Sequence, residues 1–223
     1  MKNIESFFTK IVEIVQSGLD IILPQTKSEK ILRDMTGEDF YDRAIKNLRK
    51  IDKTYAIFSY QDELVKSAIW SLKYRRNKKI AKLLSEAISP SFMEIIENEK
   101  MFNNFSNPIL VPVPANKAKK RERGFDQTRL LVKYLIKQLP KNFIQTEIKG
   151  LKRVKKNLNQ ARTKSRQSRF ENLKNSLIAK SNLKNKNIVV LDDVSTSGAT
   201  FKEAKRALKK VGAKKIIFFV VAR

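Results

Sequence analysis

Two adjacent carboxylates at the end of an apolar run carry the clearest chemistry in this sequence. Residues 188–200 read I-V-V-L-D-D-V-S-T-S-G-A-T, so that four apolar residues lead directly into Asp192 and Asp193. An unbroken β-branched run of this kind is typical of a strand buried on both faces. Open α/β sheets place their ligands at the carboxyl ends of such strands. We therefore expect the acidic pair to lie in a binding site.

A hydroxyl-rich turn with one glycine follows the acidic pair. Gly198 allows a tight turn whose successive N–H groups point into one concavity, and a helix is predicted to begin there. The amides and dipole of a helix N-terminus favour an anion such as phosphate. The predicted phosphate site consists of Val194, Ser195, Thr196, Ser197, Gly198, Ala199 and Thr200.

The acidic pair and the turn together indicate a phosphorylated ribose. Carboxylates repel a bare phosphate, whereas ribose hydroxyls, or a divalent cation shared with a diphosphate, would suit them. Two other interpretations stay open at this point. The segment could be a buried strand that ends in a solvated acidic turn, or it could be an acidic magnesium site like that of response regulators.

The segment resembles the phosphoribosyl-pyrophosphate (PRPP) motif of type I phosphoribosyltransferases. The resemblance implies that Asp192 and Asp193 hold the ribose 2′- and 3′-hydroxyls and that residues 195–200 hold the 5′-phosphate. We expect the two aspartates to be the catalytic residues and also the ligands of a Mg²⁺ cofactor.

Composition excludes several other kinds of site. The 223 residues contain no cysteine and no histidine, which excludes disulfides, thiolate or imidazole metal sites and a Ser-His-Asp triad. The formal charge of +26 would attract nucleic acid, an anionic membrane or a polyphosphate, although lysine drift in an AT-rich genome explains it equally well. No stretch approaches the roughly 18–20 apolar residues that span a bilayer. We therefore expect a cytoplasmic protein without a membrane partner.

An α/β fold is predicted from residue 107 onward, because strand and helix patterns alternate there as in a parallel sheet flanked by helices. The predicted strands cover residues 109–113, 143–148, 188–191 and 215–221, and the predicted helices cover residues 126–138 and 200–211. The stretch 107–223 would form the core of a type I phosphoribosyltransferase-like fold.

The remaining half of the chain is predicted to be mainly helical. Residues 1–53 would form a helical N-terminal region whose apolar stripe packs on the main domain or on a second copy, as in a homodimer. Residues 54–106 would form a strand-helix-helix subdomain, with a strand at 55–60 and an interruption at Pro90. This subdomain could supply the hood that covers an acceptor in such enzymes.

A basic loop after the first core strand is placed to hold pyrophosphate. The segment V-P-V-P-A-N-K-A-K-K-R-E-R-G lies at the same carboxyl edge of a parallel sheet as Asp192. We assign this role to Ala115, Asn116, Lys117 and Arg123. Taken alone, the segment would be interpreted as a solvated basic loop.

A second basic stretch over residues 151–187 shows no clear apolar period before Phe170. Lys152, Arg153 and Arg169 could form a flexible clamp on phosphate oxygens, because arginine grips them with a planar fork. A nucleic-acid groove is the competing interpretation, although few aromatic residues are available nearby to stack bases.

These motifs occur in an order that is similar to the ComF family of PRPP-motif proteins, which are associated with DNA uptake in natural competence. The shared residues are Tyr60, Leu72-Lys73-Tyr74, Val111-Pro112-Val113-Pro114, Arg123-Gly124-Phe125, Gln127, Leu151-Lys152-Arg153, Gln160, Arg169, Asn172 and Asp192-Asp193-Val194. Many members carry a four-cysteine zinc module, which this chain cannot form, so we expect no zinc. Asp126 stands where the family usually shows asparagine.

The resemblance implies a protein that binds PRPP, or a related ribose phosphate, and transfers its phosphoribosyl group to an unknown acceptor. The alternative is a non-catalytic protein of the same fold that binds single-stranded DNA or competence and replication proteins. A peripheral membrane adaptor that uses residues 1–23 is a third and weaker option.

Overall fold

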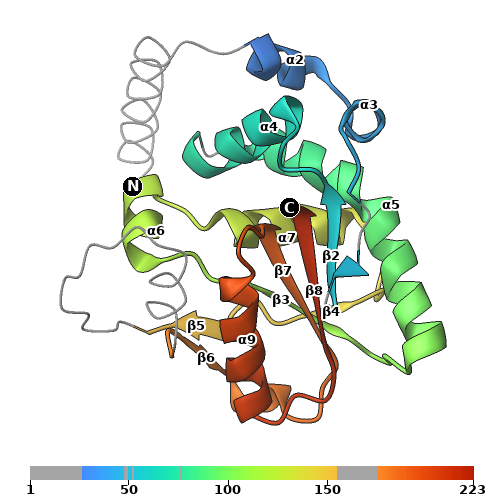
Figure 1. The fold of residues 1–223 in the computed structure, drawn as a ribbon, viewed down its shortest axis with the longest axis vertical. Coiled ribbons are helices and arrows are strands. Elements are labelled where there is room, and N and C mark those ends of the chain that lie inside the picture. Colours follow the sequence, from blue (N-terminus) through green and yellow to red (C-terminus); the bar gives the residue numbers. More distant parts are fainter. Residues whose placement is uncertain (1–26, 48–49, 52, 76, 155–174) are drawn as a thin grey trace, which may run out of the picture.

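A parallel sheet covered by helices on both faces organises the protein (Figure 1). The computed structural model describes residues 27–47, 50–51, 53–75, 77–154 and 175–223. The main sheet has the order β1-β2-β8-β7-β3-β4, in which β2, β8, β7, β3 and β4 are mutually parallel and β1 is antiparallel to β2. The predicted fold class, a type I phosphoribosyltransferase-like parallel sheet flanked by helices, is confirmed.

The elements include those that the sequence patterns indicate from residue 107 onward, and also β5, β6 and α6, which the patterns did not predict. The strands are β1 (Lys50–Ile51), β2 (Thr54–Phe58), β3 (Ile109–Pro112), β4 (Gln145–Thr146), β5 (Leu151–Arg153), β6 (Leu177–Ala179), β7 (Ile188–Val194) and β8 (Ile216–Ala222). The helices are α2 (Lys27–Asp34), α3 (Gly37–Arg43), α4 (Glu63–Tyr74), α5 (Lys78–Asn103), α6 (Lys117–Arg123), α7 (Gln127–Gln138) and α9 (Ala199–Lys210), with a 3₁₀ turn at Ser181–Leu183.

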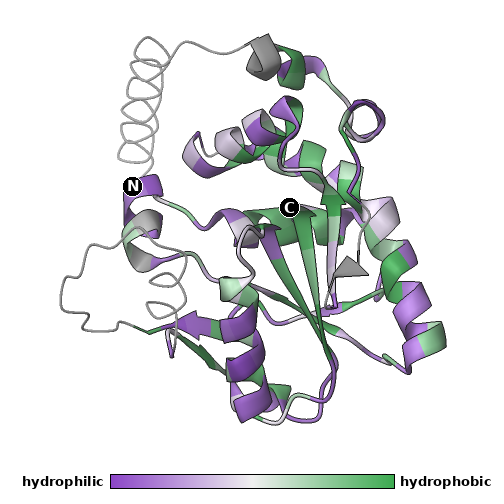
Figure 2. Ribbon diagram, in the orientation of Figure 1, coloured by the Kyte–Doolittle hydropathy of each residue, from purple (hydrophilic) through white to green (hydrophobic). Residues whose placement is uncertain are grey.

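The core lies in two layers, one on each face of the sheet. Along β7 the side chains alternate, so that Val189 and Leu191 join one apolar cluster while Ile188 and Val190 join the other. Helices α3, α4, α5 and α7 contribute to the first cluster, and α9 with the β5–β6 hairpin contributes to the second. The apolar strands are visible between the two layers in Figure 2. This double burial explains why β7 and β8 read as unbroken apolar runs.

Strands β7 and β4 differ in length from their predicted ranges more than the other strands do. Strand β7 continues three residues beyond Leu191, because Asp192 pairs with Val220 and Val194 pairs with Ala222 on β8. The acidic pair is therefore part of the strand and does not follow it. Strand β4 covers only Gln145–Thr146, both exposed at the edge of the sheet, whereas the pattern predicted residues 143–148. Short edge strands leave few unpaired backbone groups for other chains to bind.

Helix α5 runs without interruption through Pro90, where the sequence predicted a break. Proline cannot donate the hydrogen bond that the carbonyl of Glu86 would otherwise accept. That carbonyl accepts a hydrogen bond from Ser89 Oγ at 3.1 Å instead. Helix α5 can therefore pack along one face of the sheet, where Phe92 contacts Phe219 edge to face at 4.9 Å.

The N-terminal predictions are tested only in part. Helices α2 and α3 lie in the region predicted to be helical, while the apolar stripe expected over residues 7–23 is outside the described residues. Strand β2 pairs with β8, so the segment that begins the predicted 54–106 subdomain also belongs to the core sheet. The division into regions 1–53, 54–106 and 107–223 stays a prediction. Among the described residues, no helix is both long and apolar enough to cross a bilayer.

We predict that Gly37→Ala destabilises the fold by about 1–3 kcal/mol, because the contact between α3 and α5 leaves no room for a methyl group. A Cβ on Gly37 would lie 2.9 Å from the amide nitrogen of Ala87, which cannot move aside. Urea unfolding would measure the loss. Asp42→Ala, on the exposed side of the same helix, is the control and should change the free energy of unfolding by less than about 0.5 kcal/mol. Equal stability of the two variants would contradict this packing.

Candidate ribose-phosphate site

The acidic pair lies buried at the carboxyl end of β7. Asp192 is 8% exposed and Asp193 is 4% exposed. Oδ1 of Asp192 accepts a hydrogen bond from the amide of Asp193 at 2.9 Å and one from Thr128 Oγ1 at 3.4 Å. Thr128 stands in the first turn of α7, so the helix that follows the neighbouring strand β3 supports the first carboxylate.

A lysine from α4 neutralises the second carboxylate. Lys73 Nζ lies 3.0 Å from Oδ2 of Asp193, and both side chains are largely buried. Helix α4 follows β2 and lies over the carboxyl edge of the sheet, which brings its last turn to the end of β7. This ion pair joins the predicted hood segment to the core.

The two aspartates have opposite shifts in pKa. Burial, and then the charge of Asp193, raise the pKa of Asp192 well above its ordinary value. Burial would also raise the pKa of Asp193, but the charge of Lys73, together with the hydrogen bonds that Asp193 makes with Lys73, Asp192 and the backbone of Val194, outweighs it and holds that pKa below the ordinary value. Burial would lower the pKa of Lys73, but its charge interaction and hydrogen bond with Asp193, with smaller contributions from Tyr60 and Asp192, raise that pKa above the ordinary value. Asp193 is therefore the ionised member of the pair, and Asp192 is the member that holds a proton more readily.

The turn between Asp193 and α9 has the backbone geometry expected of a phosphate cradle. Gly198 adopts a left-handed conformation with φ of 70° at the N-cap of α9, and a Cβ added there would meet no atom within 4 Å. The backbone of Ser195 is held in place by a hydrogen bond from its amide to the carbonyl of Ala222 at 3.1 Å. Ser197 Oγ accepts a hydrogen bond from the amide of Ala199 at 3.4 Å. The predicted roles of Val194, Ser195, Thr196, Ser197, Gly198, Ala199 and Thr200 in holding a phosphate stay predictions.

A cleft of about 350 Å³ opens above the acidic pair, and its walls come from several parts of the chain. Because β3 and β7 are parallel neighbours, the loop after β3 lies beside the acidic pair. The lining residues are Lys73, Tyr74, Val113, Pro114, Ala115, Asn116, Arg123, Gln127, Thr128, Arg153, Asp192, Asp193 and Thr200. Seven of the residues predicted for the site are thus brought together: Asp192, Asp193, Thr200, Ala115, Asn116, Arg123 and Arg153.

The predicted pyrophosphate loop is largely helical. Asn116 caps α6 by accepting a hydrogen bond from the amide of Ala118, and Gly124 ends the helix with φ of 75°. The cap explains how a strongly basic segment can form a short helix. The backbone of Lys117 is in the first turn of α6, and its side chain is outside the described residues.

Asp126 stabilises the backbone next to the basic helix. Its carboxylate caps α7 through the amide of Arg129 at 3.2 Å and accepts a hydrogen bond from the amide of Ala115, also at 3.2 Å. The guanidinium group of Arg129 lies 3.5 Å away. The extra negative charge that the sequence showed near the pyrophosphate segment is thus used to cap a helix and to hold the loop after β3.

The predicted clamp is partly a β-hairpin instead of a loop. Lys152 and Arg153 belong to β5, which pairs with β6 across the undescribed residues 155–174. Arg153 Nε donates to the carbonyl of Pro114 at 3.0 Å, which holds this guanidinium group at the cleft. Lys152 is exposed and is not among the lining residues, and Arg169 is outside the described residues.

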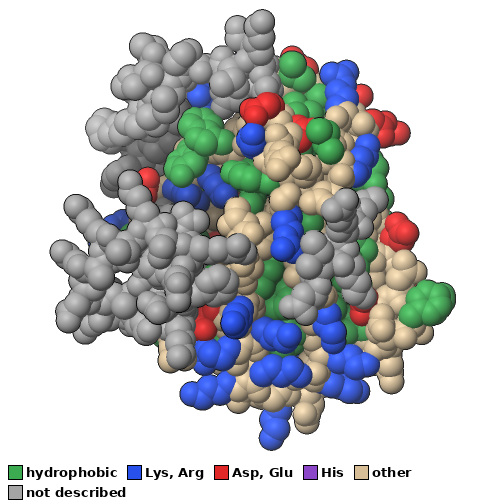
Figure 3. All heavy atoms as spheres, in the orientation of Figure 1, with side chains coloured by type: hydrophobic (Ala, Val, Ile, Leu, Met, Phe, Trp, Pro, Cys, Tyr) green, Lys and Arg blue, Asp and Glu red, His purple; other side chains and the backbone are tan. Residues whose placement is uncertain are grey.

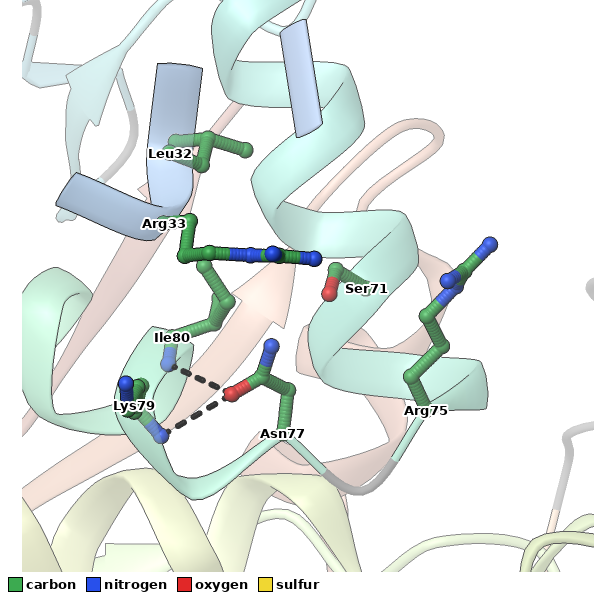
Figure 4. Close-up of a pocket in the computed structure, with 7 residues that line it drawn as sticks. All are labelled: Leu32, Arg33, Ser71, Arg75, Asn77, Lys79 and Ile80. Atoms are coloured by element: carbon green, nitrogen blue, oxygen red, sulfur yellow. Dashed lines mark hydrogen bonds between the residues drawn. The ribbon is translucent and has the colours of Figure 1, made fainter. Parts of the chain in front are cut away.

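A second cleft, of about 310 Å³, lies on another side of α4. Figure 4 shows Arg33 extending from α2 toward Ser71 on α4, with Asn77 below them. Asn77 Oδ1 already accepts hydrogen bonds from the amides of Lys79 and Ile80 at the start of α5. Among the described residues that line this second cleft there is no acidic side chain, so the chemistry expected for a ribose belongs to the cleft above β7.

Sequence reasoning assigned no role to four of the polar residues that line the cleft. Lys73, Tyr74 and Gln127 appeared only as parts of motifs, and Thr128 was not singled out. Lys73 and Tyr74 end an amphipathic helix, where a polar residue is ordinarily solvated. The only signal that could have found them is the topology, which places the end of α4 over the edge of the sheet.

Comparisons with known proteins agree with this geometry. Residues 129–223 match the phosphoribosyl transferase domain. The chain is 26% identical over 157 residues to "Competence protein ComFC" of Bacillus subtilis, an alignment that covers 70% of this chain and 58% of that protein. It is 32% identical over 117 residues to "Competence protein F" of Haemophilus influenzae, which covers 51% of this chain and 49% of that protein. The chain spans about half the length of the curated relatives it matches.

The acidic pair fits Mg²⁺ only together with a ligand. Within the described part of the chain, no group of three or more His, Cys, Asp or Glu side chains could hold a metal ion. Asp193 is also paired with Lys73. Mg²⁺ commonly binds through one or two carboxylates plus substrate phosphates, so Asp192 and Asp193 suit an ion that arrives with a diphosphate.

We predict that the two isosteric substitutions in the acidic pair change stability in opposite directions. Asp192→Asn should raise the free energy of unfolding at neutral pH, because it removes a buried carboxylate whose ionisation is unfavourable. Asp193→Asn should lower it by about 1–3 kcal/mol, because it leaves the ammonium group of Lys73 without a counterion. Urea unfolding in the presence of a chelator measures both changes.

The pH dependence of the stability gained by Asp192→Asn is the control for this prediction. Because the folded protein binds the Asp192 proton more tightly than the unfolded chain, ionisation of Asp192 lowers stability. The advantage of Asp192→Asn should therefore be absent below the ordinary aspartate value of 3.8 and should grow as the pH rises through the raised pKa. An advantage that does not vary with pH would refute the assigned burial cost.

Proposed function

We propose that this chain, a phosphoribosyltransferase-like protein of the ComF type, binds PRPP or a closely related ribose phosphate in the cleft above β7. The observation that carries the proposal is that a buried acidic pair, a glycine turn at a helix N-terminus and two arginines meet at one edge of the sheet. A ribose with phosphates at both ends requires this combination of hydroxyl acceptors and anion donors.

The arrangement suggests a role for each part of the cleft. Asp193, held ionised by Lys73, would accept hydrogen bonds from the ribose diol together with Asp192. The turn at Gly198 would receive the 5′-phosphate at the start of α9. Arg123, Arg153 and Asn116 also line the cleft, and the two arginines would bind the diphosphate.

The proposed reaction is transfer of the phosphoribosyl group to an unidentified acceptor. A nitrogen atom of the acceptor would attack C1 of the ribose, and the bond from C1 to the diphosphate oxygen would break. The acceptor is itself the nucleophile, which is compatible with a chain that has no cysteine or histidine. The protein would orient the two reactants and stabilise the leaving diphosphate through its guanidinium groups. Mg²⁺ bound to the diphosphate would supply further neutralisation of its charge.

Binding of single-stranded nucleic acid is a second candidate function, alone or together with competence or replication proteins. Helix α9 presents a row of exposed lysines on its outer side: Lys202, Lys205, Lys209 and Lys210. Figure 3 shows Lys and Arg side chains gathered on the lower half of the face that carries α9. A surface of this kind attracts phosphate groups without reading sequence.

We expect PRPP to bind with a stoichiometry of one per chain in calorimetric titrations that contain Mg²⁺. The double variant Asp192→Asn/Asp193→Asn should lose this binding. Arg123→Gln should weaken PRPP by about 10- to 100-fold, because a charge-assisted hydrogen bond to phosphate is lost, and should affect ribose 5-phosphate much less.

Thermal unfolding of the same variants is the control for folding. Binding of PRPP by the double variant as tightly as by the parent would reject the site. A parent protein that binds no PRPP in the presence or absence of Mg²⁺ would reject the proposed function.

For nucleic acid, we expect the double variant Lys205→Gln/Lys210→Gln to weaken binding of a single-stranded oligonucleotide and to leave PRPP binding unchanged. If both lysines contact phosphates, the slope of log K against log salt should become shallower by about 1.4. Fluorescence anisotropy at several salt concentrations measures this slope. An unchanged slope would show that nucleic acid does not use the exposed side of α9.

A further inference from the structure

An exposed aromatic ring from α4 stands directly over a cationic group of the cleft. Tyr74 is 47% exposed, although it is the last residue of a helix that otherwise buries its apolar side chains. The guanidinium carbon of Arg123 lies 4.7 Å from the centre of its ring. This contact joins α4 to α6 across the mouth of the cleft that both residues line.

The ring of Tyr74 is itself supported from behind. The ring of Trp70, one turn earlier on α4, lies 5.4 Å from it at an angle of 37°. Arg75 in turn lies over the ring of Trp70 at 5.3 Å. Side chains four residues apart on a helix are neighbours, so Trp70 can restrict the rotation of Tyr74 without a contact from another element.

Arg123 has an unused hydrogen-bond donor. Its Nε is buried and has no hydrogen-bond partner among the described residues. A buried donor without a partner is costly, and a phosphate oxygen would satisfy it with a strong charge-assisted bond. Arg153 differs in this respect, because its Nε already donates to the carbonyl of Pro114.

The geometry of the stacking contact explains how Arg123 can be held and yet remain available. A cation–π contact uses the flat face of the guanidinium group, whereas its N–H groups point outward in the plane. An ion pair with a carboxylate would instead occupy those N–H groups. Stacking on Tyr74 therefore restricts the position of Arg123 and leaves its donors to a ligand.

We infer that Tyr74 is a positioning residue for Arg123, and that it presents the guanidinium group to the diphosphate of a bound ribose phosphate. The inference rests on the proposed function and adds to it the residue that prepares the diphosphate end of the cleft. Tyr74 acts through Arg123 and not by contact with the ligand.

The test compares Tyr74→Ala, Tyr74→Phe, Arg123→Ala and the double variant Tyr74→Ala/Arg123→Ala in the full chain. PRPP, inorganic pyrophosphate and ribose 5-phosphate are titrated separately by calorimetry with Mg²⁺. Tyr74→Ala should weaken PRPP and pyrophosphate by about 3- to 30-fold, as expected for loss of one partly buried cation–π contact. Ribose 5-phosphate should be unaffected. Tyr74→Phe keeps the ring and should bind as the parent does.

The double variant separates positioning from direct contact. If Tyr74 acts through Arg123, the double variant loses no more affinity than Arg123→Ala alone. Additive losses would show that Tyr74 touches the ligand, and equal losses for ribose 5-phosphate would show a general disturbance of the cleft; either result overturns the inference.

Two controls keep the outcomes distinct. Phe102→Ala removes a 74% exposed aromatic ring at the other end of α5 and should change none of the affinities. A parent protein that binds neither PRPP nor pyrophosphate overturns the proposed function and the inference with it. A parent that binds both, with Tyr74→Ala unchanged, overturns the inference alone.

Discussion

The burial of two adjacent carboxylates at the end of β7 is the constraint on which the rest of the cleft depends. Two such groups cannot both ionise in a place where water is excluded unless a cation lies close by. Lys73 supplies that cation at 3.0 Å from Asp193, and it can do so only because α4 crosses the carboxyl edge of the sheet. The position of α4 depends in turn on β2, which pairs with β8, and on α5, which packs against the same apolar layer. The predicted hood segment and the core are therefore parts of a single electrostatic arrangement.

Charge alone does not explain what the cleft would select. The formal charge of +26 is spread over the whole chain and would attract any polyanion. The cleft differs because its cations are fixed at separate places: Lys73 at the acidic pair, Arg153 at the carbonyl of Pro114, and Arg123 on the ring of Tyr74. The same cleft contains the carboxylate of Asp193, which remains ionised. A ligand must bring both hydroxyl donors and phosphate oxygens to satisfy this set, and a simple polyanion brings only the second.

The parts of the site that could be predicted from the sequence are those that depend on local structure. The apolar run of β7, the two aspartates that end it and the left-handed Gly198 lie within eleven residues of one another. Their relative positions are therefore fixed by local structure and would be the same in any parallel sheet. The contacts of Lys73 and Tyr74 join residues that are far apart in the chain, and the periodicity of apolar residues in the sequence does not predict such a contact. The continuity of α5 through Pro90 and the β5–β6 hairpin were missed for a related reason. Pro90 predicts a helix break, but the hydrogen bond from Ser89 Oγ to the carbonyl of Glu86 satisfies the group that proline leaves unpaired. The basic stretch shows no strand pattern, and β5 is instead stabilised by its pairing with β6.

The two ends of the cleft are coupled through consecutive residues of one helix. In the proposed binding mode, Lys73 acts at the ribose end through Asp193, and Tyr74 acts at the diphosphate end through Arg123. Because both side chains leave the last turn of α4, a displacement of that turn would move both contacts together. A ribose diol that donates hydrogen bonds to Asp193 would compete with Lys73 for the same carboxylate oxygen. A diphosphate that binds the N–H groups of Arg123 would not displace the contact of Arg123 with the ring of Tyr74. The ribose end therefore exchanges one interaction for another, while the diphosphate end only gains interactions. On this argument the diphosphate of the proposed ligand would contribute most of the net affinity, and the acidic pair would contribute selectivity for a sugar that carries free hydroxyls.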